Sequence, residues 1–204
     1  MPNDINAIIF DIGNVLADWD PRVPLEGLFP QEQIEAFFAD SAFDEFDFAM
    51  DGDTPLDEAR DAFAARHPDH LDMLDTIVES YDKTIVGPVP GMTELVERLA
   101  ACKSVQIFGL SNWWESTFHL VLEKVPSVHL LQEIVVSGFE GLTKPDPAIY
   151  QLAIDRFGVT PSHTLFVDDR AINTQAAAVL GFRTHLFTDA TALNEVLEQL
   201  GLNG

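Results

Sequence analysis

Three apolar runs, far apart in the chain, each stop at a carboxylate or a hydroxyl group, and this pattern constrains the fold more than any other feature. The runs and the residues that end them are Ile8–Phe10 with Asp11, Ile107–Leu110 with Ser111, and Leu165–Val167 with Asp168. Such a run is typical of a buried parallel strand with a functional group at its carboxyl end. Ligands of open α/β sheets bind outside these ends. The pattern therefore predicts a parallel sheet with a ligand site at one edge.

Strands and helices alternate along the second half of the chain. After a first strand at 7–10, we expect strands at 105–110, 133–136, 164–167 and 184–187, and helices at 93–101, 114–122, 147–157, 171–180 and 194–200. Alternation of this kind builds right-handed βαβ units around a parallel sheet. The predicted fold class is therefore α/β, with a Rossmann-like parallel sheet core flanked by helices.

A long segment between the first and second predicted strands has a different composition. Residues 18–89 contain 19 acidic residues against four basic ones, and they are rich in phenylalanine. Apolar residues recur there at steps of three and four, which is an amphipathic helix pattern. The pattern ends at the Pro/Gly-rich segment 87–91. We predict an inserted all-α cap at residues 18–88, and an α/β core formed by residues 1–17 and 89–204.

The charge and the cysteine content exclude several classes of partner. The formal net charge is −23, from 34 acidic and 11 basic residues. Nucleic acids and anionic membranes are bound through clustered Lys and Arg, so neither is an expected partner. No apolar stretch reaches the roughly 18 residues of a membrane span, and the single Cys102 cannot form an intramolecular disulfide. We expect a soluble cytoplasmic protein, monomeric or homodimeric, in which any phosphate site needs a bound cation.

Four motifs together resemble one known family. They are Asp11–Leu16, Ser111–Trp113, Lys144–Tyr150 and Leu165–Asp169. In this order, and with a helical insert after the first motif, they resemble the haloacid dehalogenase-like hydrolase superfamily. The segments Asp11–Leu16, Asp18–Arg22, Ser111–Trp113 and Lys144–Tyr150 resemble its phosphatase-like branch. The resemblance covers nearly the whole chain. It implies that Asp11 is a nucleophile whose carboxylate forms a covalent intermediate with the substrate.

The same resemblance assigns a metal site. Paired carboxylates in one turn suit a hard cation, because Mg²⁺ prefers oxygen ligands. By resemblance, Asp169 binds Mg²⁺ directly, and Asp168 acts through water or a hydrogen bond. Asp11 and the backbone carbonyl of Gly13 complete the expected set of metal ligands.

Two further motifs supply groups for the phosphate. Ser111 and Asn112 resemble the motif in which a hydroxyl and a nearby backbone amide hold a phosphoryl oxygen. Lys144 resembles the lysine that neutralises the nucleophile and the group being transferred. The resemblance therefore implies a phosphate-binding set of Ser111, Asn112 and Lys144.

The chain departs from the family pattern at Gly13. Many phosphatases of the superfamily carry a second Asp there, which protonates the leaving oxygen and later activates water. General acid–base catalysis of this kind typically contributes ~10²–10⁴-fold. Either another residue replaces it, or the substrate has a good leaving group, or turnover is slow. The candidate replacements are Asp18, Asp20, Glu115 and His119.

Three functions follow from these residues. The first is a Mg²⁺-dependent phosphatase that acts on a small metabolite, such as a sugar phosphate, through an aspartyl-phosphate. The second is a metal-free 2-haloacid dehalogenase, which does not need the Asp missing at Gly13 but has no use for the Asp168–Asp169 pair. The third is a non-catalytic binding or regulatory protein, which has no physical reason to keep the nucleophile, the lysine and the metal carboxylates.

Overall fold

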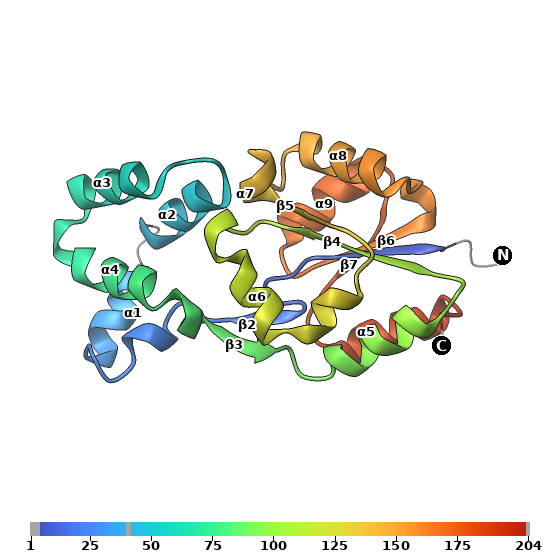
Figure 1. The fold of residues 1–204 in the computed structure, drawn as a ribbon, viewed down its shortest axis with the longest axis horizontal. Coiled ribbons are helices and arrows are strands. Elements are labelled where there is room, and N and C mark those ends of the chain that lie inside the picture. The colour runs from blue at the N-terminus through green and yellow to red at the C-terminus, as the bar shows by residue number, and fades with distance from the viewer. Residues whose placement is uncertain (1–4, 40–41, 203–204) are drawn as a thin grey trace.

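The computed structural model describes residues 5–39 and 42–202, and a five-stranded parallel sheet runs through it (Figure 1). The strand order is β5–β4–β1–β6–β7, and every pairing is parallel. The strands are β1 (Ala7–Phe10), β4 (Gln106–Ser111), β5 (Ile134–Val136), β6 (Thr164–Asp168) and β7 (Arg183–Leu186). All five predicted strands are present, with their ends shifted by one residue at most. The predicted α/β fold is confirmed.

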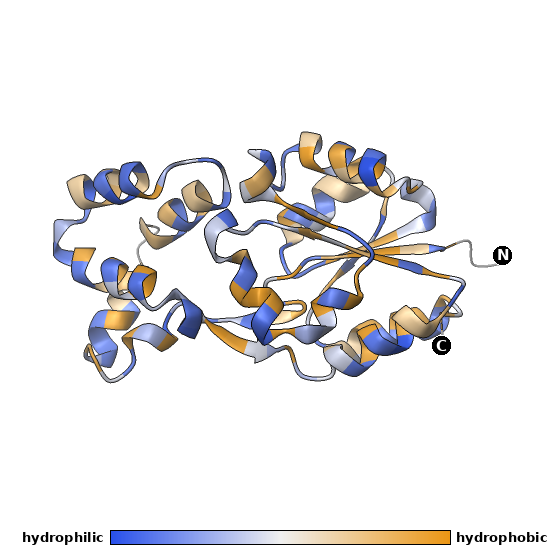
Figure 2. Cartoon of the chain, in the orientation of Figure 1, coloured by the Kyte–Doolittle hydropathy of each residue, from blue (hydrophilic) through white to orange (hydrophobic). Residues whose placement is uncertain are grey.

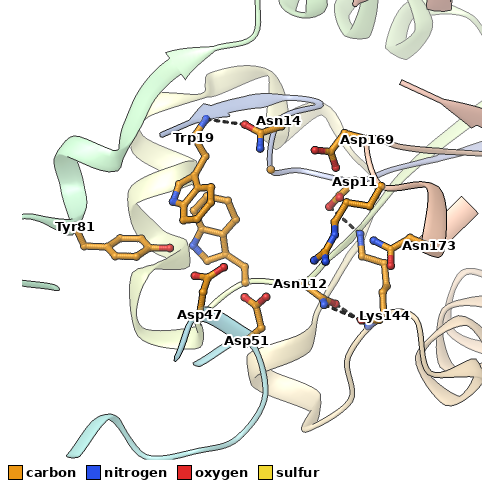
Figure 3. A pocket seen from close by; sticks show the side chains of 13 residues that line it. Asp11, Asn14, Trp19, Asp47, Asp51, Tyr81, Asn112, Lys144, Asp169 and Asn173 are labelled. Carbon is orange, nitrogen blue, oxygen red and sulfur yellow. Dashed lines mark hydrogen bonds and ion pairs between the residues drawn. The ribbon is translucent and has the colours of Figure 1, made fainter. Parts of the chain in front are cut away.

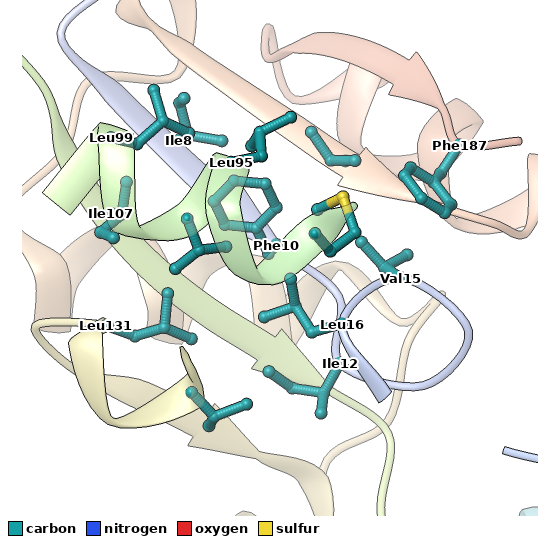
Figure 4. Packing of buried hydrophobic residues seen from close by; sticks show 14 of the residues in the cluster. Ile8, Phe10, Ile12, Val15, Leu16, Leu95, Leu99, Ile107, Leu131 and Phe187 are labelled. Atoms are coloured by element: carbon teal, nitrogen blue, oxygen red, sulfur yellow. The ribbon is translucent and has the colours of Figure 1, made fainter. Parts of the chain in front are cut away.

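Helices cover both faces of this sheet. One face packs against α5 (Met92–Ala101), α6 (Phe118–Lys124) and α10 (Ala190–Gln199), and the other against α8 (Pro147–Phe157) and α9 (Ala171–Val179). Successive side chains of a strand point to opposite faces. In β1, Ile8 and Phe10 accordingly join the first apolar cluster (Figure 4), whereas the other two residues join the second. Both faces of β1 are therefore buried, which explains its continuous apolar run.

Two helices differ from their predicted bounds by more than one residue. The predicted helix at 114–122 is a 3₁₀ turn, Glu115–Thr117, followed by α6. The helix predicted at 194–200 begins at Ala190, because the Asp189 side chain accepts a hydrogen bond from the Ala192 amide (2.9 Å) and caps its first turn. A short helix, α7 (Ser137–Glu140), follows β5 and was not predicted.

The expected helical insertion lies between β1 and β4 and is confirmed. It contains α1 (Gln31–Ala39), α2 (Ala42–Asp51), α3 (Leu56–Arg66) and α4 (Leu71–Glu79), at one end of the molecule in Figure 1. These helices enclose an apolar cluster of their own, which includes Phe37, Phe46, Phe63 and Leu74. The phenylalanines of the insertion thus form its core.

A second, two-stranded sheet was not predicted. The strands β2 (Ala17–Trp19) and β3 (Ile85–Pro88) pair antiparallel where the chain enters and leaves the insertion. The remaining short helices are 3₁₀ turns at Val23–Leu25, Pro68–His70, Tyr81–Thr84, Pro126–Leu130 and Pro161–His163. Apolar residues concentrate in the sheet and on the inner faces of the helices (Figure 2). Within 5–39 and 42–202, no helix has the length and apolar character to cross a membrane.

Candidate active site

The polar residues that end β1, β4 and β6 meet at one edge of the sheet. Asp11 follows β1, while Ser111 and Asp168 are the last residues of β4 and β6. Because β1 pairs with both β4 and β6 in parallel, their carboxyl ends lie side by side. All three residues are buried. The edge of the sheet therefore gathers the functional groups of three separate motifs.

Lys144 lies between two of these carboxylates. Its Nζ is 2.9 Å from Asp11 Oδ1 and 2.7 Å from Asp168 Oδ2, and it donates a hydrogen bond to the Leu110 carbonyl (3.0 Å). Burial acts to lower the pKa of Lys144, but the two carboxylates outweigh burial and raise this pKa above its ordinary value. Lys144 is therefore a buried ammonium ion at neutral pH.

The backbone around Lys144 is fixed by Asn112. The Asn112 side chain donates to the Lys144 carbonyl (3.0 Å) and accepts from the Lys144 amide (2.7 Å). The Ser111 hydroxyl, in contrast, donates to the Asn112 carbonyl (3.2 Å) and does not line the cavity described below. Asn112 thus has a structural role in placing the lysine, in addition to any contact with a ligand.

Asp168 and Asp169 differ in their surroundings. Asp168 accepts hydrogen bonds from the Arg170 amide (2.8 Å) and from Asn173 Nδ2 (3.0 and 3.1 Å), and it is fully buried. Asp169 is partly buried and borders the cavity. Asp168 is thus held in place by several protein donors, while Asp169 borders the cavity described below.

Asp11, Asp168 and Asp169 offer carboxylate oxygens that all lie within 4.8 Å of one another. Burial raises the pKa of Asp11 well above its usual range, with Asp168 and Asp169 adding to the effect and Lys144 opposing it. Burial and the charge of Asp168 likewise raise the pKa of Asp169. A bound cation would reverse this balance and keep the carboxylates ionised. Three oxygen donors with an excess of negative charge fit Mg²⁺.

A cavity of about 90 Å³ opens beside this cluster (Figure 3). The core contributes Asp11, Gly13, Asn14, Asn112, Trp113, Lys144, Asp169, Arg170 and Asn173 to its lining, and the segment 18–88 contributes Trp19, Asp47, Asp51 and Tyr81. Trp19 and Trp113 meet edge to face, with ring centroids 6.5 Å apart. The cavity therefore has aromatic and charged residues in its lining, and residues of the segment 18–88 border it opposite the core.

The sequence did not single out Asp47, Asp51 or Arg170. Asp47 and Asp51 are four residues apart in α2, so they share one face of this helix. That spacing was the only available signal, and in an acidic amphipathic segment it is equally typical of a solvated face. Only the packing of α2 against the core places both carboxylates at the cavity.

The four proposed replacements for the missing acid lie elsewhere. Asp18 and Asp20 border a second cavity of about 780 Å³, which adjoins the first. Glu115 and His119 are exposed and line neither cavity.

Relatives of known activity include both a phosphatase and a cyclase. The sesquiterpene phosphatase astK of Aspergillus oryzae is 24% identical, with 98% of both chains covered. The drimenol cyclase drtB of Aspergillus calidoustus is 26% identical over 90% of this chain, but the chain spans only 34% of the length of drtB.

The fold has solved counterparts. The enzyme BT-2542 of Bacteroides thetaiotaomicron, solved with magnesium and inorganic phosphate, superposes with a TM-score of 0.64 at 21% identity, covering 91% of this chain and 95% of that one. The sequence pattern of haloacid dehalogenase-like hydrolases matches residues 5–181. Since this match takes in most of the chain, together with the sheet edge and its carboxylates, the protein belongs to the haloacid dehalogenase-like hydrolases.

Proposed function

We propose that the protein is a Mg²⁺-dependent phosphatase that hydrolyses the monoester of a small metabolite, such as a sugar phosphate, through an aspartyl-phosphate at Asp11. The observation that carries this proposal is the cluster of Asp11, Asp168 and Asp169 beside the buried Lys144. A carboxylate is a weak nucleophile towards a phosphate dianion, so it needs a cation and a positive group close by. The magnesium and phosphate bound by BT-2542 support the same reaction class.

Each residue has a part in this reaction. Asp11, Asp169 and the carbonyl of Gly13 would hold Mg²⁺, with Asp168 supporting the site, and the ion would neutralise charge on the phosphoryl oxygens. Asp11 attacks phosphorus. Lys144 pairs with Asp11 and with the transferring group. Ser111 and Asn112 bind phosphoryl oxygens. To do so, the Ser111 hydroxyl must give up its hydrogen bond to the Asn112 carbonyl and donate to the phosphate instead.

The lining of the site suits a small substrate. The cavity beside the carboxylates measures about 90 Å³, and the segment 18–88, proposed as a cap over the core formed by 1–17 and 89–204, borders it with Trp19 and Tyr81. Acidic side chains of the cap would repel large polyanions. We place the enzyme in the cytoplasm, as a monomer or a homodimer.

Dehalogenation of a 2-haloacid is the alternative within the family. It requires the nucleophile but no metal, and position 13 carries no acid. Against it, a site for displacing a halide has no need of a second and a third carboxylate beside Asp11. Those carboxylates repel the carboxylate of a haloacid unless a cation is bound.

The experiment is the hydrolysis of p-nitrophenyl phosphate by the purified protein, with Mg²⁺ and with EDTA, in parallel with chloroacetate. We expect phosphate release only with Mg²⁺, and none from Asp11→Asn. Chloride release from chloroacetate in EDTA, without phosphatase activity, would replace the proposal by the dehalogenase. Activity in neither assay would favour a non-catalytic binding protein.

A further inference from the structure

The proposed reaction lacks a proton donor at position 13. When an alkyl phosphate is cleaved, the leaving oxygen must gain a proton, and Gly13 has no side chain to supply it. A Cβ atom at Gly13 would make an ordinary van der Waals contact with the Trp113 ring, at 3.5 Å, so the nearest neighbour at this position is an aromatic ring with no acidic proton to donate. The donor must therefore come from another part of the cavity.

Asp51 occupies the opposite wall of this cavity. It is the last residue of α2, and it borders the same space as Asp11 and Lys144. In Figure 3 the side chains of Asp47 and Asp51 project into this space from the cap, facing Asp11 and Lys144 of the core. In phosphoryl transfer the attacking and leaving oxygens are roughly in line, so a leaving group displaced by Asp11 departs towards the wall opposite Asp11.

The position of Asp51 is fixed by the core. The Ser137 hydroxyl donates a hydrogen bond to the Asp51 carbonyl and accepts one from the Trp113 amide (2.9 Å). Ser137 is fully buried and begins α7, which packs against α2. The residue following Asp51, Gly52, approaches the Thr143 side chain in the loop that carries Lys144. The end of α2 is thus held, through Ser137, to the loop that follows β4, and it lies close to the loop that carries Lys144.

The charges around Asp51 favour a protonated carboxyl group. Burial raises the pKa of Asp51 well above its usual range; Asp47 of the same helix and Asp11 of the core add to the effect, while Lys144 and Arg170 oppose it. A general acid must carry its proton at the working pH.

Asp47 is less suited to the same role. Burial and Asp44 raise its pKa to about 7, with Arg170 opposing, so the groups that influence it do not include Asp11 or Lys144. Of the two carboxyl groups, Asp51 is thus the one whose pKa responds to Asp11 and Lys144, and its backbone carbonyl is held by Ser137.

We propose that Asp51, supplied by the cap, is the general acid and base of the phosphatase, an inference that rests on the function proposed above. As Asp11 bonds to phosphorus and the bond from phosphorus to the leaving oxygen breaks, that oxygen takes the Asp51 proton and departs as an alcohol. The Asp51 carboxylate then accepts a proton from the water that attacks phosphorus. This step releases inorganic phosphate and restores both Asp11 and protonated Asp51.

The test compares leaving groups. The value of kcat/KM reports the steps up to departure of the leaving group, so it isolates the role of Asp51 as an acid. For Asp51→Asn with Mg²⁺, we expect kcat/KM on ethyl phosphate to fall by about 10²–10⁴-fold. The loss on p-nitrophenyl phosphate should be much smaller, because its leaving group needs little protonation. For wild type on ethyl phosphate, kcat/KM should fall at alkaline pH, because Asp51 ionises. This fall should be absent in Asp51→Asn.

Asp53→Asn is the matched control, since Asp53 is exposed two residues away and lines neither cavity. We expect its kcat/KM to equal the wild-type value on both substrates. Equal losses on both substrates in Asp51→Asn, or a wild-type rate on ethyl phosphate, would overturn the role of Asp51. A wild-type protein no more active than Asp11→Asn on p-nitrophenyl phosphate would instead refute the phosphatase function itself.

Discussion

Replacing Asp47 by Asn should stabilise the metal-free protein at alkaline pH. Burial, aided by Asp44, raises the pKa of Asp47 from 3.8 to about 7. Between these values the folded protein keeps a proton that the unfolded chain has lost. Wild-type stability therefore falls as the pH rises from about 4 to about 7. Asn does not titrate, so the free energy of unfolding of Asp47→Asn should not show this decrease with pH.

The size of the effect follows from the shift. About three pKa units correspond to an upper bound of about 4 kcal/mol, and the partial exposure of Asp47 reduces this to about 1–2 kcal/mol. Urea unfolding in EDTA at pH 8 should show Asp47→Asn more stable than wild type by this amount, and the gap should shrink at pH 5. Asp61→Asn, at an exposed position of α3, is the control.

The opposite result would refute the reasoning. If Asp47→Asn were less stable than wild type at pH 8, then pairing of the Asp47 carboxylate with Arg170 would outweigh its burial. An equal gap at pH 5 and pH 8 would show that ionisation of Asp47 has no part in the effect.

Three further predictions concern Lys144, the metal ligand Asp169, and the packing of Gly138 beside the site. Lys144→Met should lower the free energy of unfolding by about 3–5 kcal/mol at pH 7 in EDTA, because it leaves buried carboxylates unpaired. The loss should be smaller at pH 5. It should be absent in the control Lys103→Met, which changes an exposed lysine. Asp169→Asn should raise the dissociation constant of Mg²⁺, measured by calorimetry, by more than the about 10–100-fold that is typical when a group behind a metal ligand is lost. Its circular dichroism spectrum should stay unchanged. Gly138→Ala should cost about 1–3 kcal/mol in urea unfolding, because its Cβ would lie 2.5 Å from the Glu115 amide nitrogen and force the backbone to move.

The core could be predicted from the sequence because its signals are local. Four of the five strands of the sheet, β1, β4, β5 and β6, contain an apolar run, and parallel strands of one sheet place their carboxyl ends at one edge. Asp11, Ser111 and Asp168 could therefore be grouped without a structure. The site roles given to them by family resemblance stay predictions, which the assays above test.

The cap side of the site could not be predicted in the same way. Asp47 and Asp51 lie in an acidic helix, where a carboxylate is ordinarily solvated. Their burial depends on contacts over long sequence separations, such as the hydrogen bond from Ser137 to the Asp51 carbonyl. The strands β2 and β3 were missed for a related reason, since each is short and stable only through its partner.

The central claim is that Asp11 carries the phosphoryl group during turnover. The most direct measurement is acid quenching of the enzyme during steady-state hydrolysis with Mg²⁺, followed by peptide mapping in a mass spectrometer. The account predicts a phosphate adduct on Asp11, in the peptide that contains β1, and no adduct in the Asp11→Asn variant. Turnover by wild type without any adduct, or with the adduct on another residue, would contradict it.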